Sequence, residues 1–150
     1  MLTHGELCAL IPHAGSMCLL ERVVEWDPVS ILCEAQNHRS SQHPLVRRGC
    51  LSSLHALEYA AQAMAVHGGL LARQQNRSLR GGYLAALREV VINSGDLLAL
   101  QGALSIRATQ LMAQGGNLIY QFEVSADGGL LVSGRATVIE TQQAETGASK

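Results

Sequence analysis

One long and mainly apolar stretch, SSLHALEYAAQAMAVHGGLL at 52–71, constrains the fold more than any other part of the sequence. Its Ala, Leu and Met residues have high helix propensity. On a helix its apolar residues would occupy every face, which is typical of a helix buried inside a protein. The rest of the chain is therefore expected to form a layer around this helix.

Three polar side chains share one face of the expected helix. Glu58 lies in its middle, Gln62 follows four residues later, and His55 precedes it by three. Positions three or four residues apart lie above one another on a helix. Burying a carboxylate without partners is costly, so Glu58 is either a hydrogen-bonded structural group or a site residue whose burial favours its protonated form. Gln62 is expected to support a site, and His55 to pack beside it or at a subunit interface.

The segments around the helix show the alternation of apolar and polar residues that is typical of half-buried strands. Two lie before the helix, at 17–26 and 29–37, and four after it, at 81–92, 98–109, 118–125 and 130–138. We expect a hairpin, the helix, and then four strands in a meander. One helix that is apolar all round and a single antiparallel sheet of about six strands predict an α+β hot-dog fold, in which the sheet wraps round the helix.

The chain length fits one domain, expected over 1–140, with 141–150 a polar and disordered tail. An open sheet has exposed edge strands, and edge-to-edge pairing with a second subunit would cover them. We therefore expect a homodimer, or an equivalent hetero-oligomer with another hot-dog subunit.

Charge and hydropathy exclude two classes of partner. The chain has 11 basic and 12 acidic residues, and its basic residues are scattered apart from Arg47 and Arg48. A nucleic-acid-binding surface is therefore not expected. The chain also has no uninterrupted apolar run of the roughly 20 residues that span a bilayer, so a membrane protein is not expected.

The cysteines and histidines give no metal-site pattern. Four cysteines, at positions 8, 18, 33 and 50, have no CxxC spacing, which indicates reduced thiols and a cytoplasmic location. Cys50, which precedes the helix, is the one candidate for a reactive thiol. No group of His, Cys, Asp and Glu has zinc-ligand spacing, so we expect neither a metal nor another cofactor.

Three segments together resemble one known family. The sequence IPHAGSMCLLERVVEWD at 11–27 is similar to the opening of hot-dog 3-hydroxyacyl-[acyl-carrier-protein] dehydratases, EYAAQA at 58–63 to their central helix, and SGDL at 94–97 to the turn before a long strand. The segment 57–65 more narrowly resembles the divergent branch found in aryl polyene biosynthesis. The resemblance extends to about Glu140.

The resemblance implies removal of water from a 3-hydroxyacyl chain carried on acyl-carrier protein. Family members use a loop histidine to take a proton from C2 and an acidic helix residue to handle the leaving hydroxyl. Glu58 falls on the acidic position, and His43 is the loop histidine nearest the family position, although it lies one residue further from Glu58 than in the family. His38, in the same loop, is the alternative base. The family's His-Phe-Pro-Gly becomes HPLV at 43–46.

The family's Pro-Gly before the helix is replaced by Ser52 and Ser53. Backbone N–H groups at the start of a helix are unpaired and electropositive, so those near Leu51, Ser52 and Ser53 are candidate donors to an enolate oxygen. Two other functions stay open. One is a hot-dog thioesterase, and the other is a non-catalytic subunit that binds acyl chains beside an active partner dehydratase.

Overall fold

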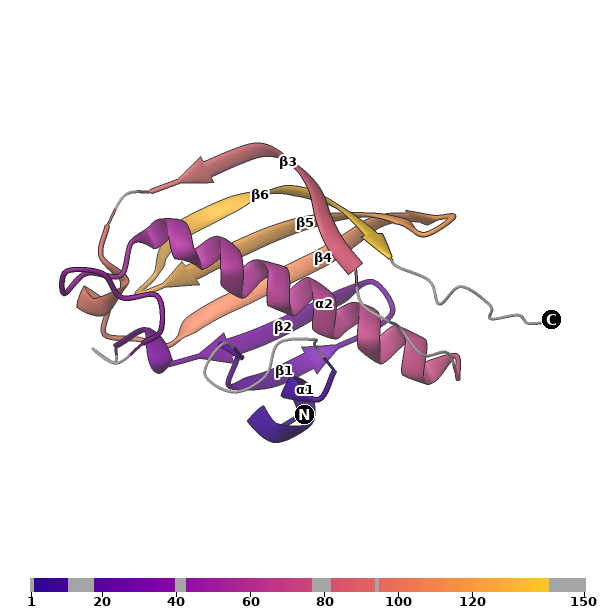
Figure 1. Cartoon of the computed structure of the whole chain (residues 1–150), viewed down its shortest axis with the longest axis horizontal. Helices are drawn as coiled ribbons and strands as arrows, with labels where there is room; N and C mark the ends of the chain where they lie inside the picture. The colour runs from indigo at the N-terminus through magenta and orange to yellow at the C-terminus, as the bar shows by residue number, and fades with distance from the viewer. Residues whose placement is uncertain (1, 11–17, 40–42, 77–81, 94, 141–150) are drawn as a thin grey trace.

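The computed structural model describes residues 2–10, 18–39, 43–76, 82–93 and 95–140. The expected tail at 141–150 lies outside these residues. One long helix and six strands dominate the fold (Figure 1). The helices are α1 (His4–Cys8) and α2 (Ala56–Gln74), and the strands are β1 (Arg22–Trp26), β2 (Ser30–Ala35), β3 (Gly82–Ile92), β4 (Leu104–Gln114), β5 (Asn117–Ala126) and β6 (Gly129–Glu140). Short 3-10 turns occupy Asn37–Arg39, Ser53–His55 and Leu97–Ala99.

The six strands form one antiparallel sheet in the order β1-β2-β4-β5-β6-β3. The sheet curves round α2, which runs along its inner face (Figure 1). The expected hot-dog architecture and the β1-β2 hairpin are confirmed. The expected four-strand meander is wrong in one respect, because β3 pairs with β6 rather than with the strand that follows it.

The inner face of the sheet carries the residues that alternation placed there. In β2, Ile31, Cys33 and Ala35 are fully buried. The buried residues of β4, β5 and β6 follow the same period of two, whereas no described side chain of β3 is buried. The buried side chains of these three strands belong to Leu104, Ile106, Ala108, Leu118, Tyr120, Phe122, Val124, Ala126, Val132 and Ala136. β4 begins six residues later than expected, because Asp96 accepts a hydrogen bond from the N–H of Leu98 and caps a 3-10 turn at the place where the strand was predicted.

The helix α2 is buried over most of its surface, but not all round. Tyr59, Ala60, Ala63 and Val66 have no exposed surface, whereas Glu58 and Ala65 are exposed. The expectation of burial on every face is therefore wrong for this chain by itself. Alanine is apolar yet small, so an alanine-rich helix can present one face to solvent at little cost.

The N-terminal region contains two features that the sequence analysis missed. No element was expected before residue 17, yet α1 forms there, with Thr3 as its N-cap. Cys8 at the end of α1 forms a disulfide with Cys18, with a Cα–Cα distance of 5.9 Å. The expectation that all four cysteines are reduced thiols is thus wrong for this pair. Cys33 and Cys50 are free thiols, and burial raises the pKa of Cys33 to about 12.

A buried histidine connects α2 to the sheet. The ring of His67 has no exposed surface; its Nδ1 lies 2.7 Å from the hydroxyl of Tyr120 on β5, and its Nε2 lies 2.8 Å from the carbonyl oxygen of Asp27. A carbonyl only accepts, so Nε2 carries the hydrogen and Nδ1 accepts from Tyr120. Because Gly68 and Gly69 follow His67, the sequence suggests a capping residue near the end of the helix; this interpretation is wrong, because α2 continues to Gln74.

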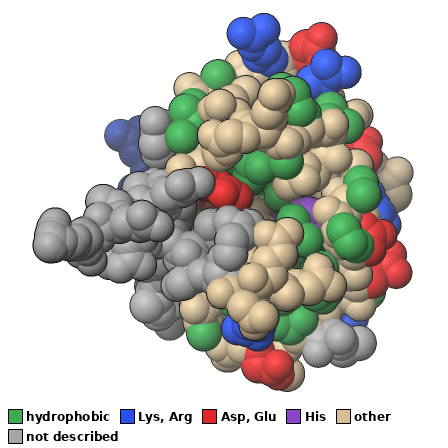
Figure 2. All heavy atoms as spheres, turned by 90° about the vertical axis from the view of Figure 1, so that its right-hand side faces the viewer, with side chains coloured by type: hydrophobic (Ala, Val, Ile, Leu, Met, Phe, Trp, Pro, Cys, Tyr) green, Lys and Arg blue, Asp and Glu red, His purple; other side chains and the backbone are tan. Residues whose placement is uncertain are grey.

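The edge strand β3 exposes apolar side chains, namely those of Leu84, Leu87, Val91 and Ile92. Figure 2 shows the end of the molecule at which α2 finishes; there, Lys and Arg side chains lie at the rim, and no continuous basic surface forms among the residues described. Within the described part of the chain, no helix is long and apolar enough to cross a membrane.

Candidate active site

Three of the histidines singled out from the sequence come together near the start of α2. His38 lies in the 3-10 turn after β2, His43 in the following loop, and His55 immediately before α2. The rings of His38 and His43 are buried, and His55 is partly exposed. Positive charge on either of the other two disfavours protonation of His43, so the three rings lie within electrostatic range.

Both ring nitrogens of His43 have partners within the chain. Its Nδ1 accepts a hydrogen bond from the N–H of Leu45 at 3.1 Å, so in the neutral ring the hydrogen is on Nε2. Nε2 donates to the hydroxyl of Tyr59 at 2.9 Å, and this hydroxyl donates to Oδ1 of Asn37 at 2.7 Å. The relay fixes the ring and joins the loop to α2.

The environment of His43 keeps its ring neutral. Its pKa is lowered below the usual value, chiefly because burial penalises the charged form, and to a lesser extent by His55 and His38. A neutral imidazole is the form that a general base requires. Here its lone pair, on Nδ1, is occupied by the N–H of Leu45. Taking a proton from a substrate would require this bond to be released.

Glu58 occupies the first turn of α2 and is exposed. The burial that was expected to favour its protonated form is therefore absent from the isolated chain. His43 bonds to Tyr59, the next residue on the helix, rather than to Glu58. The structure thus brings the candidate histidines together but does not complete a His-Glu pair within one chain.

Two of the three expected donors at the start of the helix are occupied. The N–H of Leu51 donates to Oδ1 of Asp96 at 2.9 Å, and the N–H of Ser53 donates to the carbonyl of Gly95 at 3.0 Å. Bonds from Leu51 and Leu98 are the main reason that the pKa of Asp96 is lowered. The use of Leu51 or Ser53 as an enolate-binding N–H donor is therefore not supported, because the turn before β4 takes both hydrogens.

Ser52 acts as a cap. Its side-chain oxygen accepts a hydrogen bond from the N–H of Leu54 at 3.2 Å and so begins the 3-10 turn that leads into α2. Because it donates to this oxygen, the N–H of Leu54 is also unavailable to an enolate oxygen. The serines that replace the family's Pro-Gly thus have a local structural role at the start of the helix.

Gln62 is buried, one turn of α2 beyond exposed Glu58. Its Oε1 accepts a hydrogen bond from the N–H of Leu19 at 2.8 Å. This bond ties the segment before β1 to the central helix. The side chain therefore positions the chain around the helix, in keeping with the supporting role expected for it.

Two members of the relay, Tyr59 and Asn37, escaped the sequence analysis. Tyr59 was counted as one of the apolar residues of the helix, and Asn37 as the end of a strand. A tyrosine that is fully buried needs a partner for its hydroxyl. A buried helix that contains Tyr, close in sequence to a loop with two histidines, was the signal available.

Comparison with solved structures identifies the same fold. The dehydratase heterocomplex ApeI:P from Xenorhabdus doucetiae matches with a TM-score of 0.80 and 23% identity, over 95% of this chain and 93% of the other. A thioesterase from Haemophilus influenzae matches with a TM-score of 0.67 and 14% identity, over 99% and 96% of the two chains. A hypothetical thioesterase with coenzyme A from Streptococcus pneumoniae gives 0.59 and 11%, over 83% and 88%. At these identities the likeness concerns the fold.

The sequence itself is more specific than the fold. No curated protein sequence is similar enough to match it. Residues 5–148, however, match the ApeP-like family, which is described as ApeP dehydratase. The match spans nearly the whole chain and includes both strands of the first hairpin, α2 and the four later strands. This protein belongs to the ApeP-like dehydratase family.

Proposed function

We propose that this protein dehydrates 3-hydroxyacyl-[acyl-carrier-protein] thioesters to trans-2-enoyl thioesters, in a fatty-acid or polyketide pathway of the aryl polyene kind. The family match over residues 5–148 carries this proposal. The hot-dog fold and the cluster of histidines beside the start of α2 support it.

The reaction needs a base and an acid. A base takes the C2 proton next to the thioester carbonyl, the electron pair forms the C2=C3 double bond, and the C3 hydroxyl leaves as water with a proton from the acid. We assign the base to His43, whose burial keeps it neutral, and the acid to Glu58. His38 remains the alternative base. The N–H of Leu45 must release Nδ1 of His43 before that atom can accept a proton.

We further propose that the working site includes a second hot-dog subunit. Glu58 is exposed in the single chain, as expected of a residue that a partner covers. The apolar side chains of Leu87 and Val91 along β3 favour edge-to-edge pairing of two sheets. The matched ApeI:P structure is that of a dehydratase heterocomplex, which supports a partner of the same kind here.

A turnover assay with a synthetic 3-hydroxyacyl-carrier thioester tests the chemistry. Glu58→Gln and His43→Ala are expected to abolish enoyl formation, whereas Glu123→Gln, an exposed carboxylate on β5, should leave it unchanged. His38→Ala, measured beside them, distinguishes the two candidate bases. Wild-type turnover in both the Glu58 and His43 variants, with folding confirmed by circular dichroism, would refute the assignment.

Co-expression with another hot-dog dehydratase subunit tests the partner. Val91→Glu should break the complex, as measured by light scattering after size-exclusion chromatography. Leu111→Glu on β4, which is similarly exposed, is the matched control and should leave the complex intact. Equal complex formation in both variants would contradict pairing through β3.

Two observations favour a second function. Both ring nitrogens of His43 are engaged and Glu58 is exposed, as expected if this chain binds acyl groups beside a partner that performs the chemistry. Turnover by the purified protein alone would exclude this non-catalytic role. Release of free acid and free carrier thiol, without enoyl product, would instead identify a thioesterase.

The cytoplasmic location is likewise a proposal. Acyl-carrier-protein pathways favour it, whereas the disulfide between Cys8 and Cys18 is more usual in an oxidising compartment. Cell fractionation with an antibody to the protein tests it, and recovery outside the cytoplasmic fraction would overturn it.

A further inference from the structure

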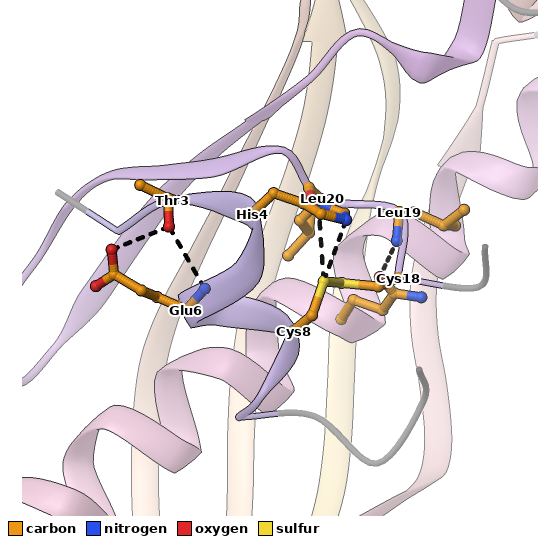
Figure 3. Close-up of a disulfide and its surroundings, with 8 residues drawn as sticks. Thr3, His4, Glu6, Cys8, Cys18, Leu19 and Leu20 are labelled. Atoms are coloured by element: carbon orange, nitrogen blue, oxygen red, sulfur yellow. Dashed lines mark hydrogen bonds between the residues drawn. A yellow bond between two sulfur atoms is a disulfide. The ribbon is translucent and has the colours of Figure 1, made fainter. Parts of the chain in front are cut away.

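His4, Cys8 and Cys18 form a compact group of potential metal ligands (Figure 3). His4 and Cys8 are four residues apart on α1 and therefore share one face of it. Cys18 approaches from the segment before β1. One ligand atom from each residue lies within 4.8 Å of the other two. The expectation that no such group exists failed because the third member lies ten residues beyond Cys8, outside the short spacings of zinc-ligand motifs.

The ring of His4 is held beside the two sulfurs. Its Nδ1 lies 2.7 Å from the carbonyl oxygen of Leu20. Because a carbonyl can only accept, Nδ1 carries the hydrogen and the lone pair is on Nε2. Sγ of Cys8 lies 3.5 Å from Nε2 and 3.7 Å from Nδ1, so it sits beside the ring, and the ring must turn for the lone pair of Nε2 to reach an ion held by the sulfurs. Metal-binding histidines characteristically donate their other ring N–H to a carbonyl or carboxylate, which fixes the tautomer and aims the lone pair at the metal.

The exposure of the group suits binding from solution. His4 is exposed, Cys8 is partly buried and Cys18 is buried, so an ion could enter from the side of His4 and be held against the protein at Cys18. Leu20, which orients the ring, is fully buried and holds its carbonyl in a fixed place. The carbonyl that contacts the ring thus belongs to the core residue Leu20, whereas His4 itself is exposed to solvent.

We propose that the reduced form of this protein binds one zinc ion through Nε2 of His4 and the thiolates of Cys8 and Cys18. Two thiolates and one imidazole are ligands that zinc favours, and a water molecule would complete a tetrahedral site. The disulfide in the structure is the oxidised form of the same ligand set. A dithiol reductant supplies the two electrons and two protons that convert it to two thiols and is itself oxidised to a disulfide; zinc binding then releases the thiol protons.

Between the two forms the sulfurs move little and the ring of His4 turns. Zinc–sulfur bonds of about 2.3 Å in a tetrahedral site require each sulfur to move by about 1 Å from its place in the disulfide. Disulfide and metal would therefore close the same junction between α1 and the segment before β1. Leu19, next to Cys18, donates its N–H to Gln62, so this junction is linked to the central helix.

Metal titration of the full-length protein tests the proposal. The protein is reduced with a phosphine, desalted without oxygen, and titrated with Co²⁺ as a spectroscopic probe and with Zn²⁺ in competition with a chromogenic chelator. Reduced wild type is expected to bind one ion and to show sulfur-to-cobalt charge-transfer absorption. The oxidised protein should show no such absorption, because neither sulfur is a thiolate.

Variants separate the site from adventitious thiol binding. Cys8→Ser and Cys18→Ser should lose the charge-transfer band or reduce it strongly, whereas Cys50→Ser, which removes an exposed free thiol, should match wild type. His4→Gln keeps both cysteines and can still form the disulfide. It should weaken zinc binding at least about tenfold.

Three results would overturn the proposal. The first is reduced wild type that binds no more metal than the oxidised protein. The second is loss of binding in Cys50→Ser equal to that in Cys8→Ser. The third is an unchanged zinc affinity in His4→Gln that forms the disulfide and gives a wild-type circular dichroism spectrum, because this would remove the imidazole from the ligand set.

Discussion

Replacing His67 with glutamine is expected to change how the stability of the protein depends on pH. The ring is fully buried, donates from Nε2 to the carbonyl of Asp27 and accepts at Nδ1 from Tyr120. Burial is the main reason that its pKa lies below the usual value, and the carbonyl and carboxylate of Asp27 oppose it in part. The folded protein therefore holds this ring in its neutral form.

The sign of the effect follows from proton binding. The unfolded chain takes up a proton on His67 as the pH falls through about 6.5, whereas the folded protein does not until its lower pKa is reached. The contribution of His67 to the free energy of unfolding is thus present above about pH 6.5 and is lost as the pH falls below this value. Between about pH 7.5 and about pH 5.5 the loss reaches at most about 1.4 kcal/mol for one histidine that stays neutral when folded. His43, whose pKa is also lowered by burial, adds a loss of the same sign.

Urea unfolding of wild type and His67→Gln at these two pH values measures the effect. At the higher pH the variant should be less stable by about 1–3 kcal/mol, because the hydroxyl of Tyr120 loses its acceptor. On acidification wild type should lose up to about 1.4 kcal/mol more than the variant. Tyr120→Phe is the matched control, since it also breaks the bond but keeps a titrating His67. Equal losses in wild type and His67→Gln would refute the reasoning.

Three further perturbations follow from the packing. Gly134→Ala should destabilise the fold by about 1–3 kcal/mol in urea, because its Cβ would lie 3.0 Å from Cζ of Phe122 and 3.2 Å from Cα of Val90; unchanged stability would show that β3 shifts freely. Tyr59→Phe should cost about 1–3 kcal/mol by leaving Nε2–H of His43 unpaired, and thermal unfolding measures it. Reducing the disulfide of α1 should lower the free energy of unfolding by at most about 3 kcal/mol, and identical urea curves with and without reductant would contradict this.

The sequence was sufficient to predict which side chains of the strands face the core, but not which strands pair with one another. Alternation in β5 correctly assigned Tyr120 and Phe122 to the core, because a period of two fixes which side chains share a face. Alternation contains no information about which strand lies beside which. The pairing of β3 with β6 was missed for this reason, since the two strands are separated by β4 and β5 along the chain.

The candidate site was predictable in its residue types and less so in its contacts. The sequence indicated a group of histidines near the helix, and in the structure His38 and His55 both lie within electrostatic range of His43. The exposure of Glu58 was not predictable, because the direction that a helix face presents depends on what covers it. The bond between His43 and Tyr59 joins positions sixteen residues apart, and no local pattern specifies it.

The position of β3 at the edge of the sheet has a consequence for synthesis of the chain. β3 is made before β4 and β5, yet its only partner in the described sheet is β6, the last strand. Contacts between residues distant in sequence form late, because a long loop must close first. β3 therefore leaves the ribosome before β6 and stays unpaired until β6 is made, with apolar side chains such as those of Leu87 and Val91 exposed along it. A pause in translation between β3 and β6 would prolong the time during which the apolar side chains of unpaired β3 are exposed, and so favour aggregation of the nascent chain.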